Sequence, residues 1–304
     1  MDTKQIEYIL KIAEENNITR AAEKLFITQS ALNQQLLKLE KELGTPLFHR
    51  SRSHWGLTEA GRIYVEGARG VLQMKNTTYN RIFDVAGAKR GTLTIGLTPG
   101  RGLKMFTAIY PQLHQDFPNL KVCPIEMRVR DQQEAIARGT IDIGFMTLGK
   151  QDRTNDKYIV LGQEELMLII PALHPAAERF GSSDGTITTI DLKELQYEPF
   201  VLMDRASTLR SICDAIFQKA GFLPNILFET NNTGGIASMV ESTLCCGIIP
   251  WYYIQKPSDK LTRFHLENTP TWDVVVSYSK NAYLSSGAQE FIRLASDWWN
   301  MSCC

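Results

Sequence analysis

The first fifty residues alternate apolar and polar positions at helical spacing. The apolar residues that share one face of a first predicted helix are Ile6, Ile9, Leu10 and Ala13. Thr19 is placed to N-cap a second helix over residues 20–25, and Thr28 to N-cap a third over residues 29–43 that ends at Gly44. The pattern therefore predicts consecutive helices joined by short turns.

The third predicted helix has an apolar face and a polar face. The apolar residues expected in the core, together with those of the second helix, are Ala21, Ala22, Leu25, Leu32, Leu36, Leu39 and Leu43. The other face is left to Gln29, Ser30, Asn33, Gln34 and Lys38. Because Gln and Asn amides pair bidentately with adenine in the major groove, this face suits base reading. An ordinary solvated face in a helical bundle is the alternative, and the helices alone do not decide.

A basic segment after the third helix has the pattern of a two-stranded hairpin. Residues 48–58, FHRSRSHWGLT, place Arg50 and Arg52 beside the predicted reading helix. Arginine contacts with phosphates position a protein on DNA without specifying sequence. Helices followed by such a hairpin predict a winged helix-turn-helix that binds double-stranded DNA.

Residues 58–89 contain no proline and predict one long helix. Its apolar and small residues at roughly heptad spacing are Tyr64, Ala68, Val71, Leu72, Thr78, Ile82 and Ala86. Such a helix is about 45 Å long and cannot bury its stripe against one small domain, so we expect it to pair with a second copy. Gly67 and Gly70 weaken it, and the alternative is two shorter helices in a monomeric bundle.

After a predicted hinge at residues 87–91, strands alternate with helices. The predicted strands are residues 92–97, 121–127, 141–146, 166–170, 200–203, 226–229 and 272–278, and the predicted helices are residues 103–117, 132–138, 209–220, 236–244 and 288–299. This alternation predicts an α/β domain with a mostly parallel, doubly wound sheet.

Ligands of such sheets bind beyond the carboxyl ends of strands, at helix N-termini that favour anions. The first strand ends in Thr98, Pro99, Gly100 and Arg101, where glycine lets the backbone approach a ligand and the arginine could clamp a carboxylate or phosphate. Hydroxyl residues at corresponding strand ends are Thr147, Ser207, Thr208 and Thr233. These eight residues are the candidate site for an effector. A helix cap without a ligand would explain each hydroxyl as well, and Arg101 could be merely solvated.

Composition and charge limit the class of protein. The 304 residues suffice for two or three domains, and no apolar run approaches the roughly 20 residues that span a bilayer. The N-terminus lacks the apolar region of a secretory signal, so we expect a cytoplasmic protein without membrane segments. The formal net charge of zero divides into +4 for residues 1–90 and −4 for the remainder, which makes the predicted head the basic end.

The sequence shows no sign of a metal, a cofactor or a catalytic site. The six cysteines, Cys123, Cys213, Cys245, Cys246, Cys303 and Cys304, have neither metal-ligand spacing nor the density of a disulfide scaffold, so reduced thiols are expected. Thiol sensing by Cys245–Cys246 or Cys303–Cys304 is an alternative. Common hydrolase, metalloprotease and phosphate-loop motifs are missing. An enzyme with an appended DNA-binding domain and a solute-binding protein for transport are the alternative functions.

Three segments together resemble the signature of LysR-type transcriptional regulators: residues 18–33 (ITRAAEKLFITQSALN), 39–50 (LEKELGTPLFHR) and 57–61 (LTEAG). Ser30 stands where that family commonly has Pro, and Asn33 where it commonly has Ser, which we expect to alter half-site preference. With the resemblance, the candidate DNA-binding residues are Thr19, Arg20, Thr28, Gln29, Ser30, Asn33, Gln34, Lys38, Arg50 and Arg52.

The resemblance implies an N-terminal winged helix-turn-helix (1–58), a linker and dimerisation helix with a hinge (59–90), and an effector-binding domain (91–304). The last is expected to have two subdomains like a periplasmic binding protein: residues 91–161 with 267–304, and residues 162–266. The implied partners are an interrupted palindromic operator, a small-molecule effector, RNA polymerase, and further copies of the chain in a homodimer or homotetramer. The helix N-termini and Arg101 favour an anion as the effector. At residues 245–247 the chain has Cys-Cys-Gly where the family often has Gly-x-Gly.

Overall fold

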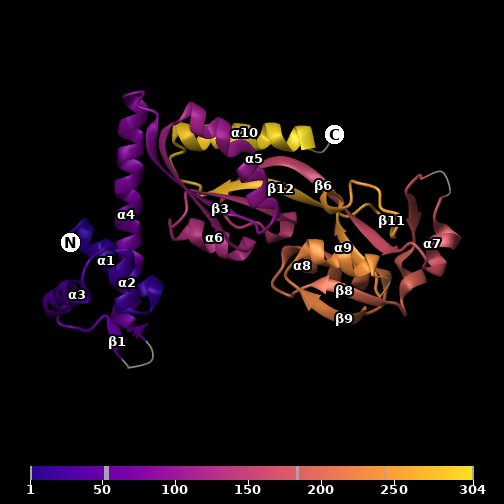
Figure 1. Ribbon diagram of the computed structural model, residues 1–304, viewed down its shortest axis with the longest axis horizontal. Coiled ribbons are helices and arrows are strands. Elements are labelled where there is room, and N and C mark those ends of the chain that lie inside the picture. Colours follow the sequence, from indigo (N-terminus) through magenta and orange to yellow (C-terminus); the bar gives the residue numbers. More distant parts are fainter. Residues whose placement is uncertain (1, 51–54, 183–184, 243, 303–304) are drawn as a thin grey trace.

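The computed structural model describes residues 2–50, 55–182, 185–242 and 244–302. An N-terminal head leads into a long upright helix, and a two-lobed domain extends away from that helix (Figure 1).

The head contains α1 (Thr3–Glu15), α2 (Ile18–Lys24), α3 (Gln29–Leu43) and an antiparallel hairpin of β1 (Phe48–Arg50) and β2 (Trp55–Leu57). This arrangement confirms the predicted winged helix-turn-helix. Thr28 caps α3 by accepting a hydrogen bond from the Ala31 amide at 3.2 Å, and Gly44 ends the helix in the left-handed region at φ 70°.

Two local predictions in the head are wrong. Thr19 does not cap α2, because the Asn17 amide oxygen accepts from the backbone N–H groups of Thr19 and Arg20 and starts the helix at Ile18. Leu43 is 44% exposed instead of buried, because it lies in the last turn of α3, beyond the packed core of the head.

The helix α4 (Glu59–Val85) is continuous, so the alternative of two shorter helices is wrong. Thr58 caps it by accepting from the Gly61 amide at 3.0 Å and donates its hydroxyl to the Pro46 carbonyl at 2.7 Å, which joins the helix to the head. The helix ends four residues earlier than predicted.

The C-terminal end of α4 is fastened to the α/β domain by side-chain hydrogen bonds. The Asn80 amide donates to the Thr92 carbonyl at 2.9 Å and accepts from the Thr92 N–H at 3.1 Å. The Asp84 carboxylate accepts from the Tyr283 hydroxyl at 2.8 Å, from the Ser286 amide at 3.0 Å and from the Ser286 hydroxyl. These contacts lie on both sides of the predicted hinge at residues 87–91, so they hold α4 and the domain together across it.

The α/β domain has a mixed sheet whose described strands run in the order β4-β3-β5-β12-β6-β11-β7, with β10 also paired to β6. These strands are β3 (Arg90–Leu97), β4 (Asn119–Glu126), β5 (Ile143–Leu148), β6 (Lys157–Pro171), β7 (Thr188–Ile190), β10 (Gly247–Pro250), β11 (Leu261–Leu266) and β12 (Thr271–Tyr278). A separate parallel pair consists of β8 (Pro199–Met203) and β9 (Asn225–Thr230). The described helices are α5 (Arg101–Asp116), α6 (Val129–Ala137), α7 (Pro175–Phe180), α8 (Thr208–Ala220), α9 (Thr233–Glu241) and α10 (Ser286–Ser302), with short 3-10 turns η1 (Lys150–Asp152), η2 (Leu192–Leu195) and η3 (Trp251–Tyr253).

The predicted α/β class is confirmed, but the prediction of a mostly parallel sheet is wrong. Strands β6 and β12 run antiparallel to each other, and β12 is also antiparallel to β5. The reason is the path of the chain, because β6 leaves one lobe for the other and β12 brings the chain back beside it. The sequence pattern detected only residues 166–170 of β6 and missed β7, β10 and β11.

The described residues form separate hydrophobic cores at the two ends of this sheet. The core of the first lobe draws on residues 93–161 and 274–299, whereas the cores of the second lobe draw on residues 166–272. Strands β6 and β12 pass from one lobe to the other, and the two lobes lie toward opposite ends of these strands in Figure 1.

We expect Asp84→Ala to lower the free energy of unfolding by about 1–3 kcal/mol, because the first amide of α10 and two hydroxyl groups lose their acceptor. Urea unfolding followed by tryptophan fluorescence measures this change, since Trp298 and Trp299 lie in α10.

The matched control for this prediction is Glu66→Ala. Glu66 is an exposed carboxylate of the same helix with no hydrogen bond or ion pair to a described residue. Its removal should change stability by less than about 0.5 kcal/mol. Equal stability of the two variants would show that Asp84 does not fasten α4.

Candidate DNA-binding face and effector cavity

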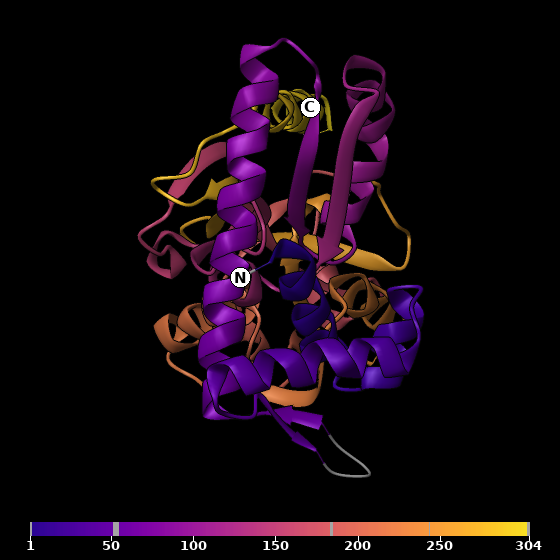
Figure 2. The ribbon, with the colours of Figure 1, turned by 90° about the vertical axis from the view of Figure 1, so that its left-hand side faces the viewer.

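The predicted DNA-reading residues lie on one end of the head. The helix α3 and the β1–β2 hairpin are both at the lower edge of the molecule (Figures 1 and 2). The exposed members of the predicted set are Thr19, Arg20, Thr28, Gln29, Ser30, Gln34, Lys38 and Arg50, and Asn33 is half-buried. Arg52 lies outside the described residues. The N-terminal half of α3 therefore presents amide and hydroxyl groups at the surface of the head.

A buried carboxylate that the sequence analysis missed joins α3 to the hairpin. Glu40 is 9% exposed and accepts hydrogen bonds from the Leu47 amide at 2.8 Å and from the Arg50 guanidinium. Arg50 also lies over the Trp55 ring at 5.8 Å. The signal was available, because Glu40 follows Leu36 by four residues and so falls on the buried face of the helix. Glu40 thus sets the direction of the Arg50 side chain.

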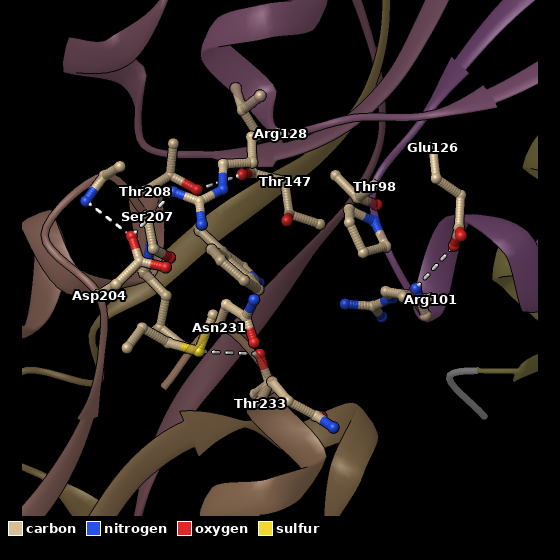
Figure 3. Close-up of a pocket in the computed structure, with 18 of the residues that line it drawn as sticks. Thr98, Arg101, Glu126, Arg128, Thr147, Asp204, Ser207, Thr208, Asn231 and Thr233 are labelled. Carbon is tan, nitrogen blue, oxygen red and sulfur yellow. Dashed lines mark hydrogen bonds and ion pairs between the residues drawn. The ribbon is translucent and has the colours of Figure 1, made fainter. Parts of the chain in front are cut away.

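A cavity of about 450 Å³ lies between the two lobes of the α/β domain (Figure 3). All eight predicted effector residues line it: Thr98, Pro99, Gly100, Arg101, Thr147, Ser207, Thr208 and Thr233. In the described part of the chain, α5, α6, α8 and α9 begin at this cavity, because their N-cap residues Gly100, Arg128, Ser207 and Asn232 are part of its lining. Helix N-termini carry unpaired amides and partial positive charge, so the cavity suits an anion.

The hydroxyl groups of the cavity have different roles. Ser207 caps α8 by accepting from the Leu209 amide at 3.2 Å, which agrees with the alternative of a simple helix cap. Thr208 donates to the Thr147 carbonyl at 2.9 Å and so links the two lobes. The Thr98 hydroxyl is buried and has no hydrogen-bond partner among the described residues. Thr98 is therefore the hydroxyl that a ligand could satisfy.

Arg101 lines the cavity, but its guanidinium is neither solvated nor free to clamp a ligand. The side chain is 3% exposed and donates to both carboxylate oxygens of Glu164. It also lies over the rings of Tyr252 at 4.3 Å and Trp299 at 4.5 Å. The local turn suggested that Arg101 would be solvated or would bind a ligand. Instead it pairs with Glu164, which is 63 positions later in the sequence but adjacent in the fold.

Glu164 collects further hydrogen bonds at the point where the lobes join. Its carboxylate accepts from the Tyr252 amide at 2.7 Å and from the Trp272 indole N–H at 2.8 Å, in addition to Arg101. Glu164 lies in β6 and Trp272 in β12, the strands that connect the lobes. The ion pair is therefore part of the connection between the lobes.

Several cavity residues were missed by the sequence analysis: Glu126, Arg128, Asp204, Asn231, Tyr253 and Trp272. Arg128 and Asp204 come from opposite lobes and form an ion pair at 3.1 Å. The Glu126 carboxylate accepts from the Gly100 amide at 3.3 Å. Burial raises the pKa of the Tyr253 hydroxyl, so this group stays protonated at neutral pH.

The cysteines of the described residues are unpaired, and Cys213, Cys245 and Cys246 are buried. Burial raises the pKa of Cys213 and of Cys246 to about 12 and also raises that of Cys245. Thiols with such pKa values are poor nucleophiles near neutral pH, which favours a packing role over thiol sensing. Cys303 and Cys304 lie outside the described residues. At the Cys-Cys-Gly segment the Cys246 amide donates to the Pro199 carbonyl, so the backbone there is paired with β8.

In the described residues no helix is long and apolar enough to cross a membrane.

A winged helix-turn-helix head, a long helix and a two-lobed domain with a cavity together define a ligand-responsive DNA-binding regulator. Residues 3–62 match the family model described as bacterial regulatory helix-turn-helix protein, lysR family, and residues 86–300 match the LysR substrate binding domain. The chain belongs to the LysR family of DNA-binding transcriptional regulators, which carry an effector-binding domain.

Relatives and solved structures agree with this family along nearly the whole chain. The uncharacterized HTH-type transcriptional regulator YcgK of Bacillus subtilis is 26% identical over 306 residues, covering 98% of this chain and 94% of its own. The Hca operon transcriptional activator HcaR of Escherichia coli is 28% identical over 254 residues, covering 83% and 82%. A full-length OxyR variant from Pseudomonas aeruginosa has a TM-score of 0.67 at 21% identity and covers 98% of this chain and 97% of its own. CbnR complexed with its target DNA has a TM-score of 0.65 at 21% identity, covering 97% and 100%.

We expect Glu164→Gln to lower the free energy of unfolding by about 3–5 kcal/mol, because it removes the charge that neutralises the buried Arg101 guanidinium. Urea unfolding of the full chain measures this loss.

Glu134→Gln is the control, because the partner of Glu134 in α6 is Arg138, whose side chain is 55% exposed. Loss of this solvated pair should cost less than about 1 kcal/mol. Comparable losses in the two variants would mean that the buried pair does not hold the lobes together.

Proposed function

We propose that α3 reads the operator in the major groove and that the β1–β2 hairpin contacts the phosphate backbone. The supporting observation is the exposed amide and hydroxyl groups in the N-terminal half of α3, in a head whose hairpin carries the exposed Arg50. In this proposal Gln29, Ser30, Asn33 and Gln34 contact bases, whereas Lys38, Arg50 and Arg52 contact phosphates. Thr19, Arg20 and Thr28 position the head on the duplex. The solved structure of CbnR with its target DNA supports a duplex as the ligand of this fold.

Pairing of α4 with a second copy brings two heads onto one operator in this proposal. The exposed large apolar residues of α4 are Ile63, Val71, Met74, Tyr79, Ile82 and Val85, and Val85 is 92% exposed. Burying this stripe against another chain removes it from water. Two-fold symmetry then places the reading helices one turn of DNA apart on an interrupted palindrome. The assembly in this proposal is a homodimer or a homotetramer.

The three domains of the proposal are residues 1–58, 59–90 and 91–304. Within the last, the first subdomain comprises residues 91–161 with 267–304, and the second comprises residues 162–266. Separate hydrophobic cores on either side of the connecting strands support this division.

The effector of the proposal is a small anion bound in the cavity between the lobes. The helix N-termini at the cavity and the unpartnered hydroxyl of Thr98 support an anionic ligand. Effector binding changes the angle between the subdomains and, through α4, the spacing of the heads.

The regulator acts in the cytoplasm, contacts RNA polymerase at the promoter and catalyses no reaction in this proposal. These points follow from the role of the family in transcription regulation.

We expect Gln29→Ala to weaken specific operator binding by about 5–150-fold, because one bidentate base contact is lost. Competitor-resistant gel shifts at fixed salt on DNA upstream of the gene measure this change, and binding to random DNA should stay the same. Gln115→Ala, at an exposed glutamine of α5, is the control. If Gln29→Ala bound the operator as tightly as the parent, the reading face would be misassigned.

We expect Ile82→Glu to dissociate the dimer, because a carboxylate is buried in an apolar helix pair. Analytical ultracentrifugation over a concentration series gives the mass of the assembly. The control is Asn76→Glu, which places the same charge at an exposed polar position of α4 that is not one of these apolar residues. A stable dimer in the Ile82→Glu protein would exclude this helix as the pairing surface.

A further inference from the structure

The two arginines that line the cavity differ in their freedom to change partner. Arg101 is 3% exposed, and its removal from Glu164 would leave a buried carboxylate without its countercharge. The Arg128 side chain is 48% exposed, and its Nη1 donates to Oδ1 of Asp204 at 3.1 Å. Solvated ion pairs of this kind form and separate at small cost. Arg128 is therefore suited to exchange one carboxylate for another, whereas Arg101 is not.

The Arg128–Asp204 pair connects the two lobes across the cavity. Arg128 directly precedes α6 in the first lobe, and Asp204 directly follows β8 in the second. Figure 3 shows their charged groups facing each other at the cavity wall. The hydrogen bond from the Thr208 hydroxyl to the Thr147 carbonyl joins the same two lobes. Separation of the ion pair would thus remove one of the polar contacts between the lobes.

The Asp204 carboxylate still has hydrogen-bonding partners when Arg128 leaves it. Its Oδ1 also accepts from the Ala206 amide at 2.9 Å, and the side chain is 25% exposed to water. On the other side, Arg128 is the N-cap residue of α6, and no side chain caps the first amides of this helix. An incoming anion at this place meets both a guanidinium and a helix N-terminus.

The other residues that line the cavity indicate the size and polarity of the rest of the ligand. Apolar side chains of Val129, Met203, Leu209 and Trp272 form part of the wall, and the Thr98 hydroxyl is buried there without a partner. A volume of about 450 Å³ is within the range of small-molecule sites. The lining fits a small carboxylate with an apolar body.

We propose that Arg128 is the effector's anion receptor and works by exchange: it releases Asp204 and binds the effector's carboxylate instead. This inference rests on the proposed function of the cavity. After the exchange the Arg128 guanidinium is still paired with a carboxylate, but the ion pair that joined the two lobes is broken. The effector competes with the Arg128–Asp204 ion pair, which forms only in the arrangement of the lobes that brings these two residues together. Effector binding is therefore coupled to the change of lobe angle.

Opposite effects of the two partners of this pair test the exchange. Phenylacetate is the probe, and 2-phenylethanol is its neutral counterpart; binding to the full chain is measured by isothermal titration calorimetry. We expect Asp204→Asn to tighten phenylacetate binding by about tenfold, because Arg128 loses its competing carboxylate, and Arg128→Gln to weaken it by at least about tenfold. The double variant should behave like Arg128→Gln alone, and none of the variants should change binding of 2-phenylethanol.

Arg130→Gln is the matched control, because Arg130 is an exposed arginine of α6 with no partner among the described residues and lies outside the cavity lining. It should bind phenylacetate as the parent does. Weakening by Asp204→Asn would overturn the proposal, because a merely structural pair loses function from either side. Equal binding of phenylacetate and 2-phenylethanol to the Asp204→Asn protein, or no binding of either, would also overturn it. Operator gel shifts of the same variants report the DNA-binding function separately.

Discussion

The arrangement of the two lobes depends on the buried carboxylate of Glu164, which lies where they join. It lies on β6, where the chain leaves the first lobe, and accepts from the Trp272 indole on β12, where the chain returns. The same carboxylate neutralises Arg101 at the start of α5 and accepts from the Tyr252 amide of the second lobe. A desolvated ion pair is favourable only with its full set of partners, so the geometry of the crossing strands and the geometry of the cavity are fixed together.

The helix α4 connects the DNA-binding head to the first lobe of the α/β domain. Asn80 and Asp84 fasten this helix to β3 and to the start of α10, both in the first lobe. Because the fastening spans the turn at residues 87–91, a rotation of the first lobe carries α4 with it. The head is joined to the other end of α4 through the Thr58 cap and its hydrogen bond to the Pro46 carbonyl. The helix α4 is therefore hydrogen-bonded at both ends, to the head and to the first lobe.

The sequence predicted those features that depend on neighbouring residues. The cap of α3 at Thr28, its end at Gly44 and the continuous α4 follow from local spacing, and the structure has each of them. The full length of β6, and with it the antiparallel course of β6 and β12, was not predicted, because the polar segment at residues 162–165 (GQEE) separates the apolar run at residues 158–161 from the one at residues 166–170. The same limit explains Arg101: the turn at residues 98–102 was read correctly, but the acidic partner lies 63 positions along the chain.

The position of the cavity was predictable from the sequence, whereas the charged groups that line it were not. The eight residues expected at strand ends all line it, because the topology of an α/β sheet brings these ends together whatever their side chains. The helix N-termini add a positive field that is likewise a property of the backbone. The charged groups of the lining, Glu126, Arg128 and Asp204, have their partners in other segments, and no local pattern marks them. Local sequence patterns therefore predict where the cavity lies, but not which charged groups line it.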